Sequence, residues 1–174
     1  VDKKLAEIYY LKNDFSKAAD AYSRFAMGPV ATEEDLVKYA FALFLNHDFE
    51  KSLEVANMGL QKNPRHAAFN RLAMYNYTDL KRFDEAMKAA DIFFNETDKA
   101  DYSYLDYMYY GHLLEDLKKY DEAVIQYEKA VQLDPSNTNL YKNISAAYER
   151  KNDYKKAISA YQKYYASLDK EKQT

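Results

Sequence analysis

Large apolar side chains recur along the chain every three or four residues, which is the spacing of amphipathic helices. Short polar stretches interrupt this pattern, and Gly28-Pro29, Asn63-Pro64 and Asp134-Pro135 break it most clearly. The pattern predicts helices over residues 1–13, 16–27, 32–46, 50–62, 66–79, 84–96, 102–117, 121–133, 137–151 and 155–169.

Five pairs of an aromatic residue and a small residue three positions later recur at a nearly constant period. The pairs are Phe15 and Ala18, Phe49 and Ser52, Phe83 and Ala86, Tyr120 and Ala123, and Tyr154 and Ala157. Successive aromatics are 34, 34, 37 and 34 residues apart. A fixed period of this length indicates stacked repeats, since one helix pair alone cannot bury its apolar face.

The fourth unit carries the fullest pattern of large and small residues. It consists of Tyr107, Tyr110, Gly111, Leu114, Tyr120, Ala123, Tyr127, Ala130 and Pro135. This spacing resembles the tetratricopeptide repeat (TPR) family over essentially the whole chain. The resemblance implies an all-α, right-handed superhelical solenoid of five antiparallel helix–turn–helix repeats. A single array would then cover residues 1–174, with repeats at about 1–31, 32–65, 66–101, 102–136 and 137–170 and a tail at 171–174.

Two features of the repeats are less regular. Phe25 and Phe93 stand where the resemblance implies a small residue, so the packing of the first and third helix pairs is left open. At the start of the second helices, we expect Ser16, Asp84 and Asp121 to act as N-caps, because short polar side chains accept hydrogen bonds from the free amides there.

Composition excludes several function classes. The 174 residues hold 25 Lys and Arg against 28 Asp and Glu, so the net charge of −3 lacks the basic excess of a general nucleic-acid binder. The absence of cysteine removes disulfides, thiolate catalysis and cysteine-ligated zinc. No run of 18 apolar residues occurs, so we expect no membrane insertion. The compartment stays open, although tyrosine-rich, cysteine-free arrays resemble bacterial envelope proteins.

The sequence holds no recognisable catalytic or metal-binding motif. His47, His66 and His112 are far apart and show no i, i+4 spacing, and the three glycines stand alone rather than in a phosphate-binding loop. Asp84-Glu85 and Asp121-Glu122 recur at one repeat position, which is typical of helix-start acids. We therefore expect a protein that is not an enzyme and has no metal or cofactor.

The resemblance implies that the first helix of each repeat lines the concave face. Its inward positions are oily and aromatic in the middle of the chain, and interface cores favour such side chains. The predicted partner-binding residues are Lys38, Phe41, Phe44, Arg71, Tyr75, Met108, Tyr109 and His112, with Lys38 and Arg71 orienting an acidic group. The alternative is that some of these side chains pack against neighbouring repeats.

These observations favour a non-catalytic scaffold that binds a protein or peptide in an aromatic groove. The alternative function is self-association, in which the array joins subunits and has no dedicated peptide site. The last helix would leave Ile158, Tyr161 and Tyr165 on an open face, so a symmetric homodimer through the C-terminal repeat is the structural hypothesis for that alternative.

Overall fold

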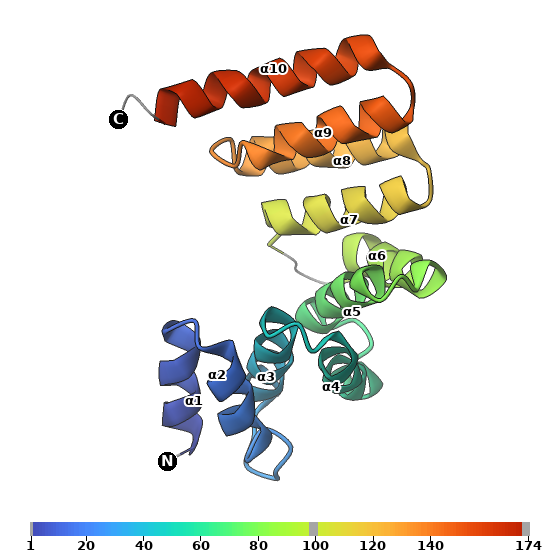
Figure 1. The fold of residues 1–174 in the computed structure, drawn as a ribbon. Helices are drawn as coiled ribbons and strands as arrows, with labels where there is room; N and C mark the ends of the chain where they lie inside the picture. Colours follow the sequence, from blue (N-terminus) through green and yellow to red (C-terminus); the bar gives the residue numbers. More distant parts are fainter. Residues whose placement is uncertain (1, 98–100, 172–174) are drawn as a thin grey trace. The chain divides into compact units, whose positions relative to one another are not determined.

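The computed structural model describes residues 2–97 and 101–171, with side chains up to residue 168. These residues form ten α-helices and no strand (Figure 1). The helices are α1 (Asp2–Leu11), α2 (Phe15–Ser23), α3 (Glu33–Leu45), α4 (Phe49–Lys62), α5 (Ala67–Asp79), α6 (Phe83–Asn95), α7 (Tyr104–Asp116), α8 (Tyr120–Leu133), α9 (Asn139–Arg150) and α10 (Tyr154–Glu171). The predicted all-α architecture of helical hairpins is therefore confirmed. The largest difference in bounds is α2, which ends at Ser23 instead of continuing to residue 27.

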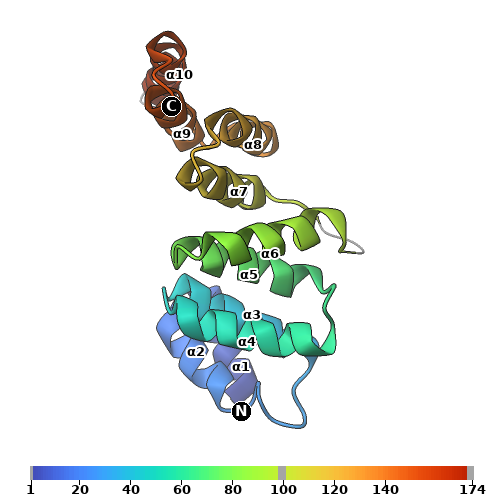
Figure 2. The same cartoon turned by 90° about the vertical axis from the view of Figure 1, so that its right-hand side faces the viewer.

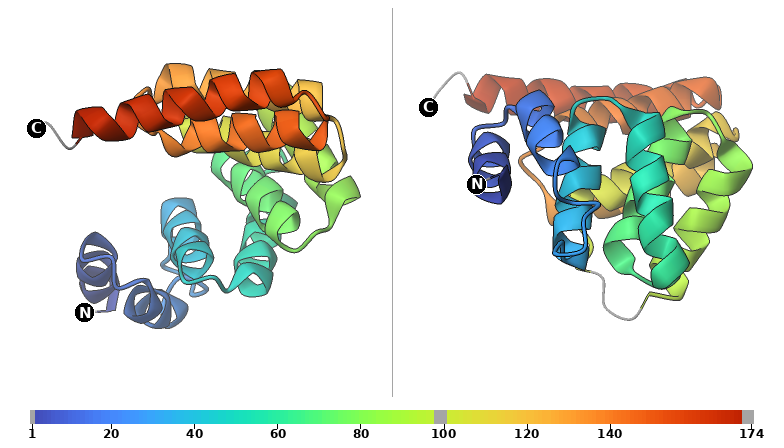
Figure 3. Two further views of the ribbon diagram at one scale, coloured as in Figure 1. Left: turned by 45° about the horizontal axis from the view of Figure 1, so that its top comes forward. Right: turned by 90° about the horizontal axis from the view of Figure 1, so that it is seen from below.

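The chain divides into two compact units, Val1–Ala100 with α1 to α6 and Asp101–Thr174 with α7 to α10. Within each unit every helix packs against the next one along the chain, and in the first unit α3 also contacts α5. Figure 2 shows the pairs α3–α4 and α5–α6 lying side by side. Figure 3 shows the same arrangement for α9 and α10 in the second unit. The predicted repeat boundaries and the single array over the whole chain both stay predictions.

The turn inside each hairpin has the same backbone geometry five times. A residue with positive φ, between 58° and 65°, lies two positions before the aromatic residue of the repeated signature. These residues are Asn13, His47, Lys81, Lys118 and Asn152. The next amide always donates to the carbonyl five residues earlier, as from Asp14 to Tyr9 at 2.9 Å and from Lys119 to Leu114 at 2.8 Å. This is the hydrogen bond that closes a helix on a left-handed residue, so the first helix ends and the chain reverses.

The predicted N-caps of the second helices are wrong by two or more residues. Asp14, not Ser16, caps α2, because its side chain accepts from the Lys17 amide at 3.3 Å. Asp84 and Asp121 lie inside the first turns of α6 and α8. There their negative charges interact favourably with the positive end of the helix dipole, but their side chains do not cap the helix.

Small residues in the hairpins let aromatic rings approach the neighbouring backbone. A Cβ on Gly111 of α7 would lie 2.4 Å from the Tyr127 ring of α8, and one on Gly59 of α4 would lie 2.2 Å from the Phe69 ring of α5. Where serine takes the small position, its hydroxyl satisfies the facing backbone: Ser52 donates to the Ala40 carbonyl and Ser145 to that of Ala157, both at 2.8 Å. The rings therefore fill the space that the missing side chains leave.

We expect Gly111→Ala to destabilise the protein by about 1–3 kcal/mol, because the new methyl group overpacks a fully buried ring. This loss outweighs the gain of about 1 kcal/mol in helix propensity. Urea unfolding followed by circular dichroism measures the change. In a Tyr127→Ala background the same substitution should be neutral or stabilising, and an equal loss in both backgrounds would contradict the predicted clash.

We expect Lys118→Gly to stabilise the protein by about 0.5–1 kcal/mol, because glycine adopts a positive φ without the Cβ penalty that lysine carries at φ 61°. The matched control is Lys119→Gly, whose φ of −89° gives glycine no such advantage. The midpoint temperature of thermal unfolding should rise for the first variant and stay equal or fall for the second. A fall in both would show that the turn is not left-handed.

Candidate functional site

In the first unit, α3 presents the predicted residues Lys38, Phe41 and Phe44. The helix starts with a capping box, in which the Asp35 amide donates to the Thr32 hydroxyl at 3.2 Å and the Thr32 amide donates to the Asp35 carboxylate at 3.0 Å. Lys3 of α1 also donates to this buried carboxylate at 3.0 Å. Burial alone raises the pKa of Asp35, but the hydrogen bonds from Lys3 and Thr32 outweigh it and hold the pKa below its usual value. The cap thus fixes where α3 begins.

The ammonium of Lys38 already has acidic partners within the first unit. It lies 2.8 Å from a carboxylate oxygen of Glu34 and 3.7 Å from one of Glu7. The hydrogen bond that Lys38 donates to Glu34 raises the pKa of Lys38 above its usual value. An acidic group on a partner would therefore compete with Glu34 and Glu7 for this cation.

The aromatic residues of α3 are half-buried. Phe41 and Phe44 pack against the core of the first unit and keep part of their surface accessible. The Phe44 ring lies 5.5 Å from the Tyr75 ring and 5.7 Å from the Phe49 ring, measured between centroids. These two side chains of α3 thus contribute to the core and still have surface that a partner could contact.

On α5, the structure places the predicted residues mainly in the core. Tyr75 is only 2% exposed, and Leu72 beside it is fully buried. The Arg71 guanidinium lies 5.1 Å from the centroid of the Phe93 ring, as expected for a cation–π contact. Tyr75 thus packs inside the protein, which is the alternative stated for these side chains. Its ring offers no surface to a partner.

In the second unit, α7 presents Met108, Tyr109 and His112 together. On α7, Gly111 faces the Tyr127 ring of α8, and Leu113 and Leu114 are also buried, whereas the three predicted residues are half-buried and Leu105 is exposed. The Tyr109 and His112 rings lie 6.1 Å apart, and Asn143 of α9 lies within hydrogen-bonding distance of the His112 ring at 3.2 Å. This helix is therefore apolar on two sides, and α9 extends the second side.

A buried polar cluster that was not predicted from the sequence lies beside this surface. Tyr127 of α8 donates to the Glu115 carboxylate of α7 at 2.7 Å, and Arg150 of α9 pairs with the same carboxylate at 2.9 Å. Burial and the bond to Glu115 raise the pKa of Tyr127. A Glu followed twelve residues later by a Tyr recurs as Glu149 and Tyr161, so the sequence carried a signal for this pair. The cluster ties α7, α8 and α9 together.

The described residues hold no cluster of metal ligands, and the three histidines lie at separate places. Among them, no group of three or more His, Asp or Glu side chains converges as metal ligands would. His47 lies in a hairpin turn, His66 precedes α5 and His112 contacts the Tyr127 ring at 5.6 Å. None of the helices in the described ranges combines the length and apolar character needed to cross a bilayer.

Comparison with known proteins places this fold. Residues 111–152 match the sequence profile of the family described as TPR repeat. Curated protein sequences give no significant match. The solved structure described as MamA 41-end from Desulfovibrio magneticus RS-1 is 16% identical, with a TM-score of 0.81 over 97% of this chain and 94% of that one. A crystal structure of MamA is 18% identical, with a TM-score of 0.77 over 98% of both chains. MamA MSR-1 is 14% identical, with a TM-score of 0.77 over 98% of this chain and 96% of that one.

Residues 111–152 are therefore similar to the TPR repeat family, and the described helical hairpins have a TPR-like fold. The matched residues 111–152 extend from α7 into the turn before α10 and include the Gly111–Tyr127 contact. At identities of 14–18% the likeness to MamA shows the fold alone. TPR folds are typically non-catalytic scaffolds for protein partners.

We expect Tyr127→Phe to destabilise the protein by about 1–2 kcal/mol, because the buried Glu115 carboxylate loses a hydrogen-bond donor while the ring volume is kept. The matched control is Tyr154→Phe, whose hydroxyl donates to Asn152 in an exposed position. The free energy of unfolding, measured with urea, should change by less than about 0.5 kcal/mol for this control. Equal effects of the two substitutions would contradict a structural role for the buried bond.

Proposed function

We propose that this TPR-like protein is a non-catalytic scaffold that binds a segment of a partner polypeptide along its first-helix surfaces. The observation that carries the proposal is the second apolar side of α7, where Leu105, Met108 and Tyr109 keep accessible surface although α7 already buries its other side against α8. Contiguous apolar surface of this kind on a folded protein marks an interaction site.

The surroundings of this surface suit a peptide. His112 and Asn143 supply side-chain donors and acceptors next to the apolar residues, which would fix the position of a bound backbone. In the first unit, Phe41 and Phe44 offer a second apolar surface, with Lys38 and Arg71 beside it as cations. We propose Lys38, Phe41, Phe44, Arg71, Met108, Tyr109 and His112 as contact residues and assign Tyr75 to the core that supports them.

The size of the apolar surface favours moderate affinity. Burying one large apolar side chain is worth about 1.5–3 kcal/mol, so four or five together give about 6–15 kcal/mol. Association costs about 4–15 kcal/mol in lost freedom, so the net gain is small and we expect a dissociation constant in the micromolar range or weaker. Competition from Glu34 and Glu7 for Lys38 lowers the contribution of an acidic group on the partner.

Site-specific photo-crosslinking tests the proposal. A photoreactive phenylalanine analogue replaces Met108, and a matched probe replaces Glu128, which is exposed on α8. The partner should crosslink at position 108 and not at 128. With the identified partner segment, the Met108→Glu/Tyr109→Ala variant should bind at least tenfold more weakly while keeping its helical circular dichroism. Equal crosslinking at both positions, or unchanged affinity of the variant, would refute the proposed surface.

Self-association through the C-terminal repeat is the second candidate function. It is favoured by the large apolar side chains of α10, since Ile158, Tyr161 and Tyr165 are all exposed. Light scattering against concentration separates the two candidates. If the protein self-associates, its mass should reach that of a dimer as the concentration rises, and Ile158→Glu should restore the mass of a monomer. A scaffold that binds other proteins should stay monomeric.

A further inference from the structure

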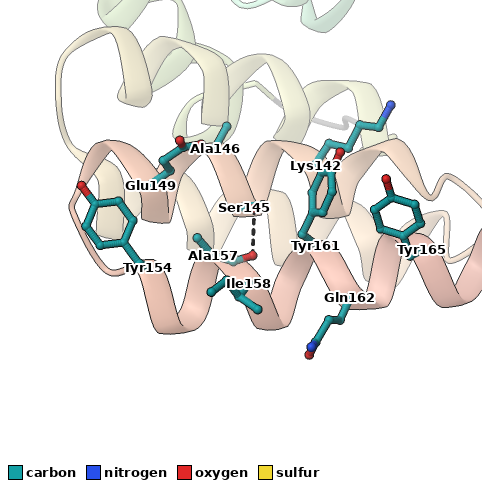
Figure 4. Close-up of a pocket in the computed structure, with 10 residues that line it drawn as sticks. All are labelled: Lys142, Ser145, Ala146, Glu149, Tyr154, Ala157, Ile158, Tyr161, Gln162 and Tyr165. Atoms are coloured by element: carbon teal, nitrogen blue, oxygen red, sulfur yellow. Dashed lines mark hydrogen bonds between the residues drawn. The ribbon is translucent and has the colours of Figure 1, made fainter.

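A groove of 740 Å³ lies between α9 and α10, at the open side of the last hairpin. Its apolar wall comes from α10 with Tyr154, Ile158, Tyr161 and Tyr165, and its polar rim comes from α9 with Lys142 and Glu149. Figure 4 shows Glu149 near Tyr154 at one end of the groove, and Tyr165 at the other. The bond from the Ser145 hydroxyl to the Ala157 carbonyl holds the two helices together at the floor.

The lining repeats a surface that is covered elsewhere in the same unit. Moving 34 residues back along the chain converts Ile158 into Val124, Tyr161 into Tyr127 and Glu149 into Glu115. Val124 is 4% exposed and Tyr127 is fully buried, whereas Ile158 is 59% and Tyr161 42% exposed. Equivalent positions therefore differ mainly in whether a further helix covers them.

The helix that covers the earlier surface is α9. It packs on α8 and buries Leu140, Ile144 and Ala147, which follow one another at intervals of four and three residues. Near its C-terminus Arg150 pairs with Glu115 at 2.9 Å. An apolar stripe and a final cation thus suffice to cover this kind of surface.

We infer that the α9–α10 groove binds an amphipathic helix of a partner polypeptide whose residues follow the pattern of α9. Leucine, isoleucine and alanine at the positions of Leu140, Ile144 and Ala147 would cover Ile158 and Tyr161. A cation at the position of Arg150 would pair with Glu149, which is exposed and has no ion-pair partner among the described residues. This surface is separate from the one proposed for α7, so either can fail without the other.

A charge on α10 beside the groove differs from the earlier repeat and defines the partner further. Lys151, the residue directly after α9, pairs with Asp121 of α8, and the residue 34 positions after Asp121 is Lys155. A lysine at the position of Lys151 would therefore meet a like charge in this groove. We expect the preferred partner helix to carry an acidic residue there, directly after the cation that pairs with Glu149.

The same comparison disfavours a second copy of this chain as the occupant. In the repeat register, α1 of another copy would place Leu11 opposite Glu149 and Lys12 opposite Lys155. A second α10 would bring Lys155, Lys156 and Lys163 and no acidic residue between 154 and 168. Neither helix supplies both the cation and the acidic residue that the groove requires.

A peptide with the sequence of residues 137–151, held helical by a staple on its outward side, is the probe. Fluorescence anisotropy with the 174-residue protein should show saturable binding. Changing the peptide residue that corresponds to Lys151 to Glu should tighten binding about threefold. Changing the residue that corresponds to Arg150 to Gln should weaken it about tenfold, as should Glu149→Gln in the protein. Combining these last two changes should cost no more than either alone, because both remove one ion pair.

Ile158→Glu should weaken peptide binding at least tenfold, because it places a charge in the apolar wall of the groove. Ile125→Glu is the matched control, since Ile125 is also an exposed isoleucine but lies on α8 outside the groove. Loss of binding in Ile158→Glu alone supports the proposal. Absence of binding at millimolar peptide, equal effects of both variants, or sedimentation showing that a second copy occupies the groove would overturn it.

Discussion

The close approach of a small residue to an aromatic ring is the contact on which the rest of this structure depends. Gly111 against Tyr127 is its clearest example, because any side chain at Gly111 would enter the ring. Ser52 and Ser145 take the small position with a polar group, since each buried hydroxyl donates to a carbonyl of the facing helix. The two helices can therefore pack closely without leaving these hydroxyls unsatisfied.

Tight hairpins decide which side chains remain for function. The small residues and one apolar stripe of each first helix are buried against the second helix of the hairpin. Large residues elsewhere on the first helix then have two fates. Tyr75 is buried by neighbouring helices, whereas Met108 and Tyr109 keep accessible surface. The proposed binding surface is thus the part of the aromatic content that hairpin and stacking contacts do not use.

The repeated signature was sufficient to predict the hairpins, because its aromatic and small residues are the ones that pack. The left-handed turns were not predictable at Lys81 and Lys118, since lysine carries no preference for positive φ and only the register reveals them. The N-caps were displaced because the helices start at the aromatic itself, before Ser16, Asp84 and Asp121. The burial of Tyr75 involves packing of its ring against Phe44 of α3, a contact between helices that residue spacing alone does not predict.

Tyrosine nitration followed by mass spectrometry tests the packing scheme most directly. The scheme predicts that Tyr154, Tyr161 and Tyr165 react readily, because they are exposed on α10. Tyr22, Tyr75 and Tyr127 should resist modification in the folded protein, because they are buried, and burial raises the pKa of Tyr22 to about 12. All six should react alike in denaturant. Ready nitration of Tyr75 or Tyr127 in the native protein would contradict the account.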